Sequence, residues 1–436
     1  MREMKDSGIE WIGEIPADWK LTPFRNILFE RSEKNIPIKT DERLSLSIDV
    51  GITLYAEKTT NLDRYKDDVS QYKIAHIGDL VLNSMNVIVG AVGVSPYYGC
   101  VSPAYYTYYD KEENHYLSRF CDYLFRCKTL RQLLFTIGKG IMAIDRGDGR
   151  VNTCRLKVSR EDLTHLKFPF PNIDEIRAIV NCLDFKCSEI DSLISDIQKQ
   201  IDTLEEYKRS VITEAVTKGL DPDVEMRDSG VQWVGMMPAH WKMKRGKYMF
   251  CQRNTRGNNI VLQLLSPTQK YGVIPQTLYE EISGYSAVKL NDKTDFSTLK
   301  TIHKGDYCIS LRSFQGGFEY SEYEGVVSPA YQVFYPTINL CRDFYKHLFK
   351  TQVFIDEMNS FTMSLRDGKN IAYDDFGNTY LPIPPINEQQ KIADHLGEKC
   401  AELDGVIADK KKQIETIEEY KKSLIFEYVT GKKEVV

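Results

Sequence analysis

The 436-residue chain lacks the features of membrane and secreted proteins. It contains no run of 18 apolar residues, which excludes a membrane-spanning helix. Its first residues, MREMKDSGIEW, are charged and include no apolar segment, so a secretory signal is not expected. None of the ten cysteines forms a CxxC pair, which argues against a zinc ribbon and for reduced thiols. These absences predict a cytoplasmic protein without membrane contact.

Catalytic signatures are missing as well. The phosphate-binding GxxxxGK[ST] loop and the HxxxH and HExxH zinc motifs do not occur. Ser102-Pro-Ala-Tyr105 and Ser328-Pro-Ala-Tyr331 lack the acidic or amide residue of the [DN]PP[YF] loop found in amino-methyltransferases. The ExK triplets that a nuclease would need, Glu206-Tyr-Lys208 and Glu419-Tyr-Lys421, lie on long helical segments and are better explained as solvated faces. We therefore expect no metal site, no bound cofactor and no catalytic activity in this chain.

The balance of charge argues weakly against nucleic acid as a ligand. Lys and Arg number 57 against 62 Asp and Glu, which gives a net charge of −5. Two segments nevertheless concentrate basic residues: 131–157 has six against two acidic residues, and 242–259 has six and no acidic residue. Basic residues interleaved with glycine suit contact with a phosphate backbone, although basic loops also occur on ordinary surfaces. A DNA-binding role would depend on such local patches.

What the sequence does contain is an internal repeat. Residues 6–20 match residues 228–242, with nine of fifteen positions identical, and residues 169–217 match residues 382–430 without a gap, with 25 of 49 identical. The difference in residue number between matching positions changes from 222 to 227 and then to 213. The interior of the repeat has therefore changed length, while its two ends have been kept. The motifs repeated in between are His76-Ile-Gly-Asp79 with His303-Lys-Gly-Asp306, and Val101-Ser-Pro-Ala-Tyr105 with Val327-Ser-Pro-Ala-Tyr331. This pattern predicts two copies of one scaffold that present different surfaces.

Each copy combines two kinds of segment. A globular stretch rich in Tyr, Val, Ile, Gly and Pro contains short strand-like runs and helix-like pieces, which predicts a mixed α+β domain. A proline-marked boundary then leads into a long helical segment without internal proline. We expect two similar domains separated by two long helices, with segment boundaries at 1–168, 169–222, 223–381 and 382–436.

The two long segments carry heptad patterns. In the first, the a and d positions hold Ile190, Leu193, Ile197, Leu204, Tyr207 and Val211, with polar Gln200 at one d position. In the second they hold Leu403, Val406, Ile417, Tyr420 and Leu424, with Lys410 in place of Ile197. Further isoleucines widen the stripe toward position e: Ile194, Ile201, Ile407 and Ile414. A helix over 173–217 would be about 65 Å long. Two such stripes predict an antiparallel coiled coil, and packing of each stripe on its own domain is the alternative.

The repeated motifs resemble the specificity subunits of Type I restriction–modification systems. The resemblance rests on the openings SGIEWIGEIPADW and SGVQWVGMMPAHW, the GD…VSPAY runs, the helix start PPINEQQKIADHL, and the helix ends EEYKRSVITEAVTKG and EEYKKSLIFEYVTGK. It covers essentially the whole chain, and four motif types each occur twice. One departure is the first helix start, PNIDEIRAI, which keeps Glu175 and Ile179 but lacks the double Gln.

The resemblance implies a non-catalytic subunit with two target-recognition domains, each of which reads one half of a bipartite, asymmetric DNA site. It also implies helices that separate these domains and dock two methyltransferase subunits, with ATP-dependent restriction subunits joining the assembly. S-adenosylmethionine, ATP and Mg²⁺ would then belong to the partner subunits. Two other interpretations stay open: a coiled-coil scaffold that binds only proteins, and a self-contained nuclease or methyltransferase with a degenerate motif.

Candidate DNA-binding residues come from the loops after the Gly-Asp strands and from basic segments. Asn and Gln pair with adenine, and Arg with guanine, in the major groove. The same residue types are equally common in turns and helix caps. The candidates are Asn83, Ser84, Asn86, Lys139, Arg146 and Arg150 in the first copy, and Arg312, Ser313, Gln315, Arg366, Lys369 and Asn370 in the second.

Overall fold

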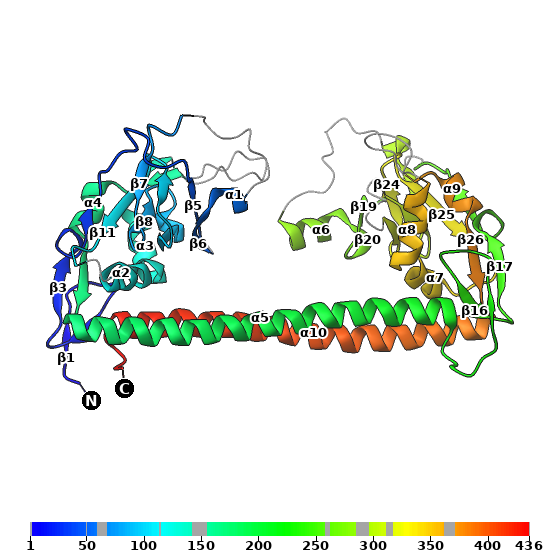
Figure 1. Ribbon diagram of the computed structural model, residues 1–436. Helices are drawn as coiled ribbons and strands as arrows, with labels where there is room; N and C mark the ends of the chain where they lie inside the picture. The colour runs from blue at the N-terminus through cyan, green and yellow to red at the C-terminus, as the bar shows by residue number, and fades with distance from the viewer. Residues whose placement is uncertain are drawn as a thin grey trace. The chain divides into compact units, whose positions relative to one another are not determined.

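The chain divides into two compact units. Unit 1 comprises Met1–Ile197 with Lys412–Val436, and unit 2 comprises Gln198–Lys411. Each unit contains one globular domain and one end of each of two long helices (Figure 1). The units cut across the four segments expected from sequence because residues of both helices enter the core of each domain. The computed structural model describes residues 2–48, 50–58, 68–112, 115–141, 155–257, 262–284, 296–310, 317–361 and 371–435.

Unit 1 is rich in short strands. They are β1 (Met4–Asp6), β2 (Glu14–Pro16), β3 (Lys20–Pro23), β4 (Phe29–Glu30), β5 (Leu44–Ser47), β6 (Gly51–Leu54), β7 (Lys73–Ala75), β8 (Leu80–Asn83), β9 (Val92–Val94), β10 (Gly99–Val101), β11 (Tyr105–Tyr109), β12 (Lys139–Ile141), β13 (Arg155–Lys157) and β14 (Lys167–Phe170). Its short helices are η1 (Phe24–Asn26), α1 (Tyr55–Lys58), η3 (Val87–Val89), α2 (Tyr116–Arg126), α3 (Lys128–Ile137) and α4 (Arg160–His165).

Unit 2 repeats this order. Its strands are β15 (Met226–Asp228), β16 (Met236–Pro238), β17 (Lys242–Arg245), β18 (Phe250–Arg253), β19 (Leu265–Thr268), β20 (Gly272–Pro275), β21 (Lys300–Ile302), β22 (Tyr307–Ile309), β23 (Phe318–Tyr320), β24 (Gly325–Val327), β25 (Gln332–Pro336) and β26 (Tyr380–Ile383). Its short helices are η4 (Gly246–Tyr248), α6 (Gln276–Ser283), η5 (Phe296–Thr298), α7 (Arg342–Leu348), α8 (Gln352–Ser360) and α9 (Tyr373–Asn378).

The central sheets of the two units have the same topology. Four antiparallel strands follow the order β4-β11-β8-β9 in unit 1 and β18-β25-β22-β23 in unit 2. The smaller pairs correspond as well, for example β5 with β6 and β19 with β20. The predicted α+β fold with two similar domains is therefore confirmed.

Alternating side chains of the central strand face two different cores. Leu80 and Leu82 of β8 belong to the large core that helices cover, whereas Val81 belongs to a smaller core on the other face of the sheet. In unit 2, Tyr307 and Cys308 divide in the same way between a large and a small core. This period of two is what a strand buried on both faces requires.

The two long helices are α5 (Ile173–Lys218) and α10 (Ile386–Val429), and each starts against a tryptophan of the repeated opening motif. The buried Trp19 donates its indole N–H to Glu175 in the first turn of α5 at 3.1 Å. Trp241 makes the same bond to Glu388 in the first turn of α10 at 3.0 Å. The contact explains why the sequence retains a glutamate at both helix starts.

The helices pack together in antiparallel fashion. Within unit 2, Lys410 of α10 donates to Gln200 of α5 at 2.6 Å, and Lys208 of α5 pairs with Asp404 of α10 at 2.6 Å. Residue numbers therefore fall along one helix as they rise along the other. In unit 1, Lys421 pairs with Asp191 at 2.6 Å, which is the repeat equivalent of Lys208–Asp404 with the two helices exchanged. The predicted pairing of the long helices is confirmed.

One of the two expected columns of seam residues, the one through Ile190 and Ile197, is correct, and the other is wrong because the adjacent column takes its place. Leu193 and Tyr207, expected in the seam, are exposed, as are Val406 and Tyr420. The less exposed positions alternate in steps of three and four along both helices: 187, 190, 194, 197, 201, 204, 208, 211 and 215 on α5, and 400, 403, 407, 410, 414, 417, 421, 424 and 428 on α10. The apolar stripe is wider than the seam, and the ion pair at Lys208 helps to fix which column enters it. In the part of the chain that the structure describes, no helix is both long and apolar enough to cross a membrane.

Candidate nucleic-acid interface and helix surface

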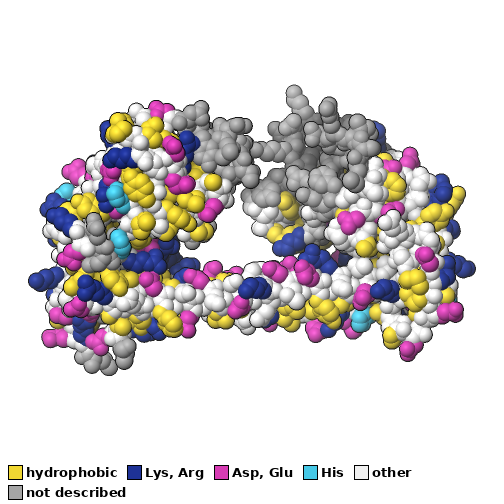
Figure 2. Space-filling model, in the orientation of Figure 1, with side chains coloured by type: hydrophobic (Ala, Val, Ile, Leu, Met, Phe, Trp, Pro, Cys, Tyr) yellow, Lys and Arg dark blue, Asp and Glu magenta, His cyan; other side chains and the backbone are white. Residues whose placement is uncertain are grey.

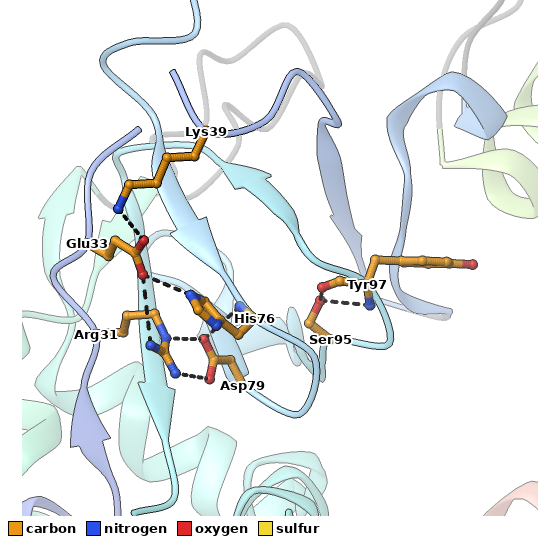
Figure 3. Close-up of polar contacts among 7 residues, drawn as sticks. All are labelled: Arg31, Glu33, Lys39, His76, Asp79, Ser95 and Tyr97. Atoms are coloured by element: carbon orange, nitrogen blue, oxygen red, sulfur yellow. Dashed lines mark hydrogen bonds and ion pairs between the residues drawn. The ribbon is translucent and has the colours of Figure 1, made fainter. Parts of the chain in front are cut away.

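The repeated Gly-Asp motif forms a buried ionic fork rather than an open site. In unit 1, Arg31 donates from Nε and Nη2 to the two carboxylate oxygens of Asp79, at 2.6 and 3.0 Å (Figure 3). The backbone N–H of His76 also donates to Asp79, at 2.9 Å. Gly78 has a φ of +86°, and a Cβ at this position would lie 1.8 Å from the ring of His115. The positive φ therefore favours glycine at this turn.

Unit 2 contains the same fork. Arg253 donates to Asp306 at 2.6 and 3.2 Å, and the backbone N–H of His303 donates to the same carboxylate at 2.9 Å. Both aspartate side chains are nearly inaccessible to solvent. The motif that repeats best in the interior of the two copies therefore stabilises the scaffold, and it does not offer a free carboxylate to a ligand.

A charged extension of the fork is present in unit 1. Glu33 accepts a hydrogen bond from Lys39 at 2.6 Å and lies 2.8 Å from His76 Nε2 and 3.9 Å from Arg31 Nη1 (Figure 3). The bond from Lys39 is the main cause that lowers the pKa of Glu33. At the equivalent position unit 2 has Thr255, whose hydroxyl is 2.5 Å from that of Thr301. The two units therefore share the Arg–Asp fork, but the polar side chains next to it differ.

Four of the twelve candidate DNA-binding residues lie in the described ranges. Asn83 is buried at the end of β8 and accepts the backbone N–H of Met85 at 3.1 Å, as a turn residue does. Ser84 is fully buried, so it has no surface to offer a ligand in this conformation. Asn86 is exposed before η3, and Lys139 is 80% exposed on β12. The candidates that fall outside the described residues are Arg146, Arg150, Arg312, Ser313, Gln315, Arg366, Lys369 and Asn370.

Lys139 belongs to a strand pair with an unfavourable arrangement of charge. Strands β12 and β13 place Lys139 directly opposite Lys157, and both lysines are exposed. Like charges opposite one another destabilise a strand pair unless an anion lies between them. The acidic neighbour Asp162 is 3.7 Å from Lys139, which offsets only one of the two charges. The pair is therefore poised to bind an anionic group.

Further cations extend this surface. Arg160 starts α4 and pairs with Glu30 at 2.9 Å. Burial lowers the pKa of Lys73, and the nearby positive charges of Arg160 and Lys157 lower it further. Lys34 lies beside Lys73 on an isolated antiparallel bridge. We call Lys34, Lys73, Lys139, Lys157 and Arg160 the basic cluster.

Sequence reasoning missed most of the basic cluster because its members come from separate parts of the chain. Lys34 precedes the β5 strand, Lys73 belongs to β7, and Arg160 follows β13. Local charge counting detected only the segment 131–157, which contains Lys139 and Lys157. The only available signal for the others was their basic character, which is not informative on its own.

The equivalent position in unit 2 carries amides. Gln252 of β18 corresponds to Glu30 of β4, and Gln332 of β25 corresponds to Tyr106 of β11. Gln252 donates to Gln332 at 3.4 Å, and Asn254 donates to Gln252 at 3.2 Å. We call Gln252, Asn254 and Gln332 the amide cluster. One scaffold position thus presents an ionic surface in one unit and an amide surface in the other.

A second surface lies on the long helices. The exposed residues Leu193 and Val406 are repeat equivalents, and so are Tyr207 and Tyr420. All four are between 40% and 54% exposed. The ion pairs Asp191–Lys421 and Lys208–Asp404 fix the register of the two helices, so Leu193 and Tyr420 lie at the same level along the pair in unit 1, as Tyr207 and Val406 do in unit 2. We call these two pairs the helix patches, and apolar side chains are visible along the helix pair in Figure 2.

The described ranges contain no group of three His, Cys, Asp or Glu side chains that could hold a metal ion. Their histidines are instead used singly. His240, for example, lies 2.8 Å from Glu388 at the start of α10, and His303 lies 2.9 Å from Glu324. Both contacts join a histidine to a carboxylate at the surface.

Comparisons with known proteins converge on one family. A family model described as "Type I restriction modification DNA specificity domain" matches residues 242–418. The putative type I restriction enzyme MjaX specificity subunit of Methanocaldococcus jannaschii is 23% identical over 454 residues, covering 97% of this chain and 95% of that protein. The type I restriction enzyme MjaVIII specificity subunit of the same organism is 25% identical over 296 residues, covering 63% and 64%.

The fold has a counterpart among solved structures. A chain from work described as "Structural basis underlying complex assembly and conformational transition of the type I R-M system" aligns with a TM-score of 0.65 at 12% sequence identity. The alignment covers 95% of this chain and 98% of that one. At this identity the likeness concerns the fold.

Proposed function

Because this chain belongs to the family of Type I restriction–modification specificity subunits, we propose that each of its domains reads one half of a bipartite, asymmetric DNA site. The chain is the specificity component of such a complex and not its catalytic component. S-adenosylmethionine, ATP and Mg²⁺ are used by the partner subunits in this proposal, and the chain itself supplies recognition and assembly.

The observation that carries the proposal is that the two units share one fold but present different side chains at the same position of it. The buried Arg–Asp forks and the strand order repeat between the units. At the same scaffold position, however, unit 1 has the ion pair Arg160–Glu30 and unit 2 has the amide cluster. A protein that reads two unlike half-sites needs this combination, because the frame sets where DNA lies and the surface sets which bases fit.

The basic cluster supports contact with the DNA backbone. Each phosphate contact that is lost should reduce the slope of log K against log salt by about 0.9. Lys139→Ala and Lys157→Ala should therefore weaken binding to all sequences alike. Arg312, which lies outside the described residues, is proposed as a base contact of the second domain, and Arg312→Ala should cost about 1–3 kcal/mol at one base position.

The helix patches support docking of two copies of one partner. Each patch combines an aliphatic residue of one helix with a tyrosine of the other, and the two patches use equivalent positions of the repeat. Exposed tyrosine beside aliphatic surface is typical of interface anchors. We propose that each patch docks one methyltransferase subunit, and that restriction subunits join this assembly. Tyr207→Ala and Tyr420→Ala should each weaken one of the two docking events.

The helix pair is also proposed to set the number of unread base pairs between the half-sites. Inserting four residues into both helices, near Gln200 and Gln413, adds about 6 Å to each. This corresponds to nearly two base pairs at about 3.4 Å per pair. The preferred spacer should lengthen while activity falls, because the added protein rotation and the added DNA rotation differ. An active double-insertion variant that kept the original spacer would contradict this role.

Methylation mapping tests the proposal. The chain is combined with a methyltransferase subunit of its family, and modified positions are located by single-molecule sequencing across a random DNA library. The expected result is one bipartite motif, with Arg312→Ala relaxing only one half and Lys139→Ala relaxing neither. Binding of the methyltransferase without any salt-sensitive DNA affinity would favour a protein-only scaffold. Methyl transfer or cleavage by the chain alone would favour an enzyme.

A further inference from the structure

Unit 1 presents a short apolar loop, residues 36–38, whose backbone is fixed by a buried side chain. Asn35 is fully buried, and its amide nitrogen donates to the carbonyl groups of Thr40 at 2.9 Å and Val69 at 3.3 Å. Its amide oxygen accepts the backbone N–H groups of Lys39 at 2.7 Å and Thr40 at 3.3 Å. Three of these four hydrogen bonds close the loop, and the fourth ties its base to Val69.

The tip of the apolar loop exposes aliphatic surface. Ile36 and Ile38 are 56% and 58% exposed, and Pro37 between them is exposed as well. A single exposed aliphatic side chain is ordinary on a protein surface. Here two stiff, β-branched side chains flank a proline on a loop that a buried asparagine braces, which makes a firm apolar projection. In the described part of the chain, neither isoleucine belongs to a hydrophobic core.

The apolar loop emerges directly from the basic cluster. The preceding residue Lys34 lies beside Lys73, and the backbone N–H of Asn35 donates to the carbonyl of Tyr72 at 3.0 Å. On the other side of the tip, Lys39 pairs with Glu33 at 2.6 Å. The projection is therefore bordered by lysines on both sides, next to a surface that suits phosphate groups.

We infer that the apolar loop enters the DNA read by unit 1 as a wedge between neighbouring base pairs. The inference rests on the proposed function and adds a mode of recognition to it. Proteins that push Ile, Leu, Phe, Met or Pro between base steps from the minor groove partly unstack them and kink the duplex. Some base steps kink more easily than others, so this half-site would be selected partly by DNA deformability rather than by base contacts alone.

The surroundings of the apolar loop favour DNA over a protein partner. An apolar protein-binding patch is usually rimmed by mixed polar residues and depleted of lysine at its centre. This loop instead directly follows Lys34, which lies beside Lys73, and both belong to the basic cluster, in which Lys139 and Lys157 face each other across a strand pair. A polyanion relieves that repulsion, and a neutral protein surface does not.

The test uses the full chain with a methyltransferase subunit and duplexes that carry 2-aminopurine at successive positions of each half-site. Fluorescence of 2-aminopurine rises when its neighbours unstack. Apart from the target bases, which a methyltransferase flips out of the stack, the wild-type chain should raise it at one further step of the half-site read by unit 1. The double variant Ile36→Ala/Ile38→Ala should remove that signal and lower affinity about tenfold, equivalent to about 1.4 kcal/mol. The salt slope should stay unchanged, because no phosphate contact is lost.

Three controls separate the explanations. Ile36→Leu/Ile38→Leu keeps an apolar wedge and should keep the fluorescence signal. Ile282→Ala removes a single exposed isoleucine from unit 2 and should change neither measurement. Lys157→Ala should lower the salt slope and leave the fluorescence step in place.

Two results would overturn the inference. The first is a double-alanine variant that retains the fluorescence step and the affinity for DNA. The second is a double-alanine variant that binds DNA normally but loses the methyltransferase, which would make the loop a protein contact. A wild-type chain with no sequence-specific DNA binding would instead overturn the proposed function itself.

Discussion

The two domains fill the same frame with different residues. In unit 1, Phe24 starts η1 and packs on Phe125 and Phe168, with ring centroids 5.5 and 5.7 Å away. At the equivalent place in unit 2 stands Gly246, where a Cβ would lie 2.7 Å from the carbonyl oxygen of Phe376. That phenylalanine in turn replaces Leu163 of unit 1. Large and small residues have exchanged places across one contact.

This exchange shows how the repeat diverged without losing its fold. Cores tolerate substitutions that conserve total volume, provided that neighbouring positions change together. Unit 2 carries more aromatic residues in this core, and Phe334 and Phe376 lie 4.6 Å apart at its centre. The Arg–Asp forks, in contrast, were kept in both units, because a buried ion pair cannot lose one partner cheaply. The core residues could therefore change as the two copies diverged, whereas the buried Arg–Asp pairs could not.

The largest expected effect tests the exchanged core contact. Phe376→Ala should reduce the free energy of unfolding of unit 2 by about 4 kcal/mol, because it leaves the larger cavity, and Leu163→Ala should reduce that of unit 1 by about 3 kcal/mol. Hydrogen exchange followed by mass spectrometry reads the two units separately. An equal loss in both units, or a loss that spreads to the unmutated core, would contradict the comparison.

The next effect concerns the conserved forks. Asp79→Asn and Asp306→Asn should each destabilise their own unit by about 3 kcal/mol, because the buried arginine contact loses its charge partner. The effects should be similar in the two units, since the distances and exposures match. Hydrogen exchange at β8 and β22 measures this. A variant that kept its stability but changed the methylated sequence would show that the fork contacts DNA.

A pH effect should distinguish unit 2 from unit 1. Burial raises the pKa of Glu319 to about 6 even though Lys350 lies 2.7 Å away, whereas unit 1 has Gly93 at this position. The folded state then holds the proton more tightly than the unfolded state does. The corresponding stability is present below pH 4.5 and is lost as pH rises through about 6. By pH 7 the loss is about 2 kcal/mol.

The variant Glu319→Gln isolates this effect. The stability of wild-type unit 2 minus that of the variant should fall between pH 4.5 and pH 7, as measured by hydrogen exchange at β22 and β23. Burial also lowers the pKa of His347 to about 4, which acts in the opposite direction and is common to both proteins. A pH-independent difference would mean that Glu319 is not desolvated.

The smallest effect concerns the mirrored ion pairs of the helices. Lys208→Ala and Lys421→Ala should each cost about 0.5 kcal/mol, because their aspartate partners are largely exposed and screened by salt. The two costs should be equal if the helices pair equivalently in both units. Helix amide exchange at two salt concentrations measures them. A cost in one unit only would show that the seams differ.

Several features followed from sequence because they depend on neighbours in the chain. The duplication, the α+β class and the start of the first long helix were all correct, and α5 extends only one residue beyond the expected end. The glutamates kept at both helix starts, Glu175 and Glu388, proved to hold a tryptophan of the opening motif. Periodicity and repeated motifs are local signals, so they survive without knowledge of the fold.

The candidate site was less predictable. Asn83 and Ser84 have the residue types of a DNA contact, but the turn after β8 buries them. Lys73 and Arg160 join Lys157 only because β7, β13 and α4 come together in space. The sequence therefore indicated a basic surface and identified only part of it.

The heptad pattern of the long helices separates what the sequence determines from what only the tertiary structure decides. Along α5, the columns through Leu193 and Ile194 both satisfy the spacing of three and four, so the sequence by itself determined that a helix with an apolar stripe would form. Only the tertiary structure decided that Ile194 enters the seam and Leu193 faces outward, because the choice depends on the facing helix and on the ion pairs that span the seam. Chain-local patterns specify elements, whereas contacts between distant residues specify which of their faces is left for a partner.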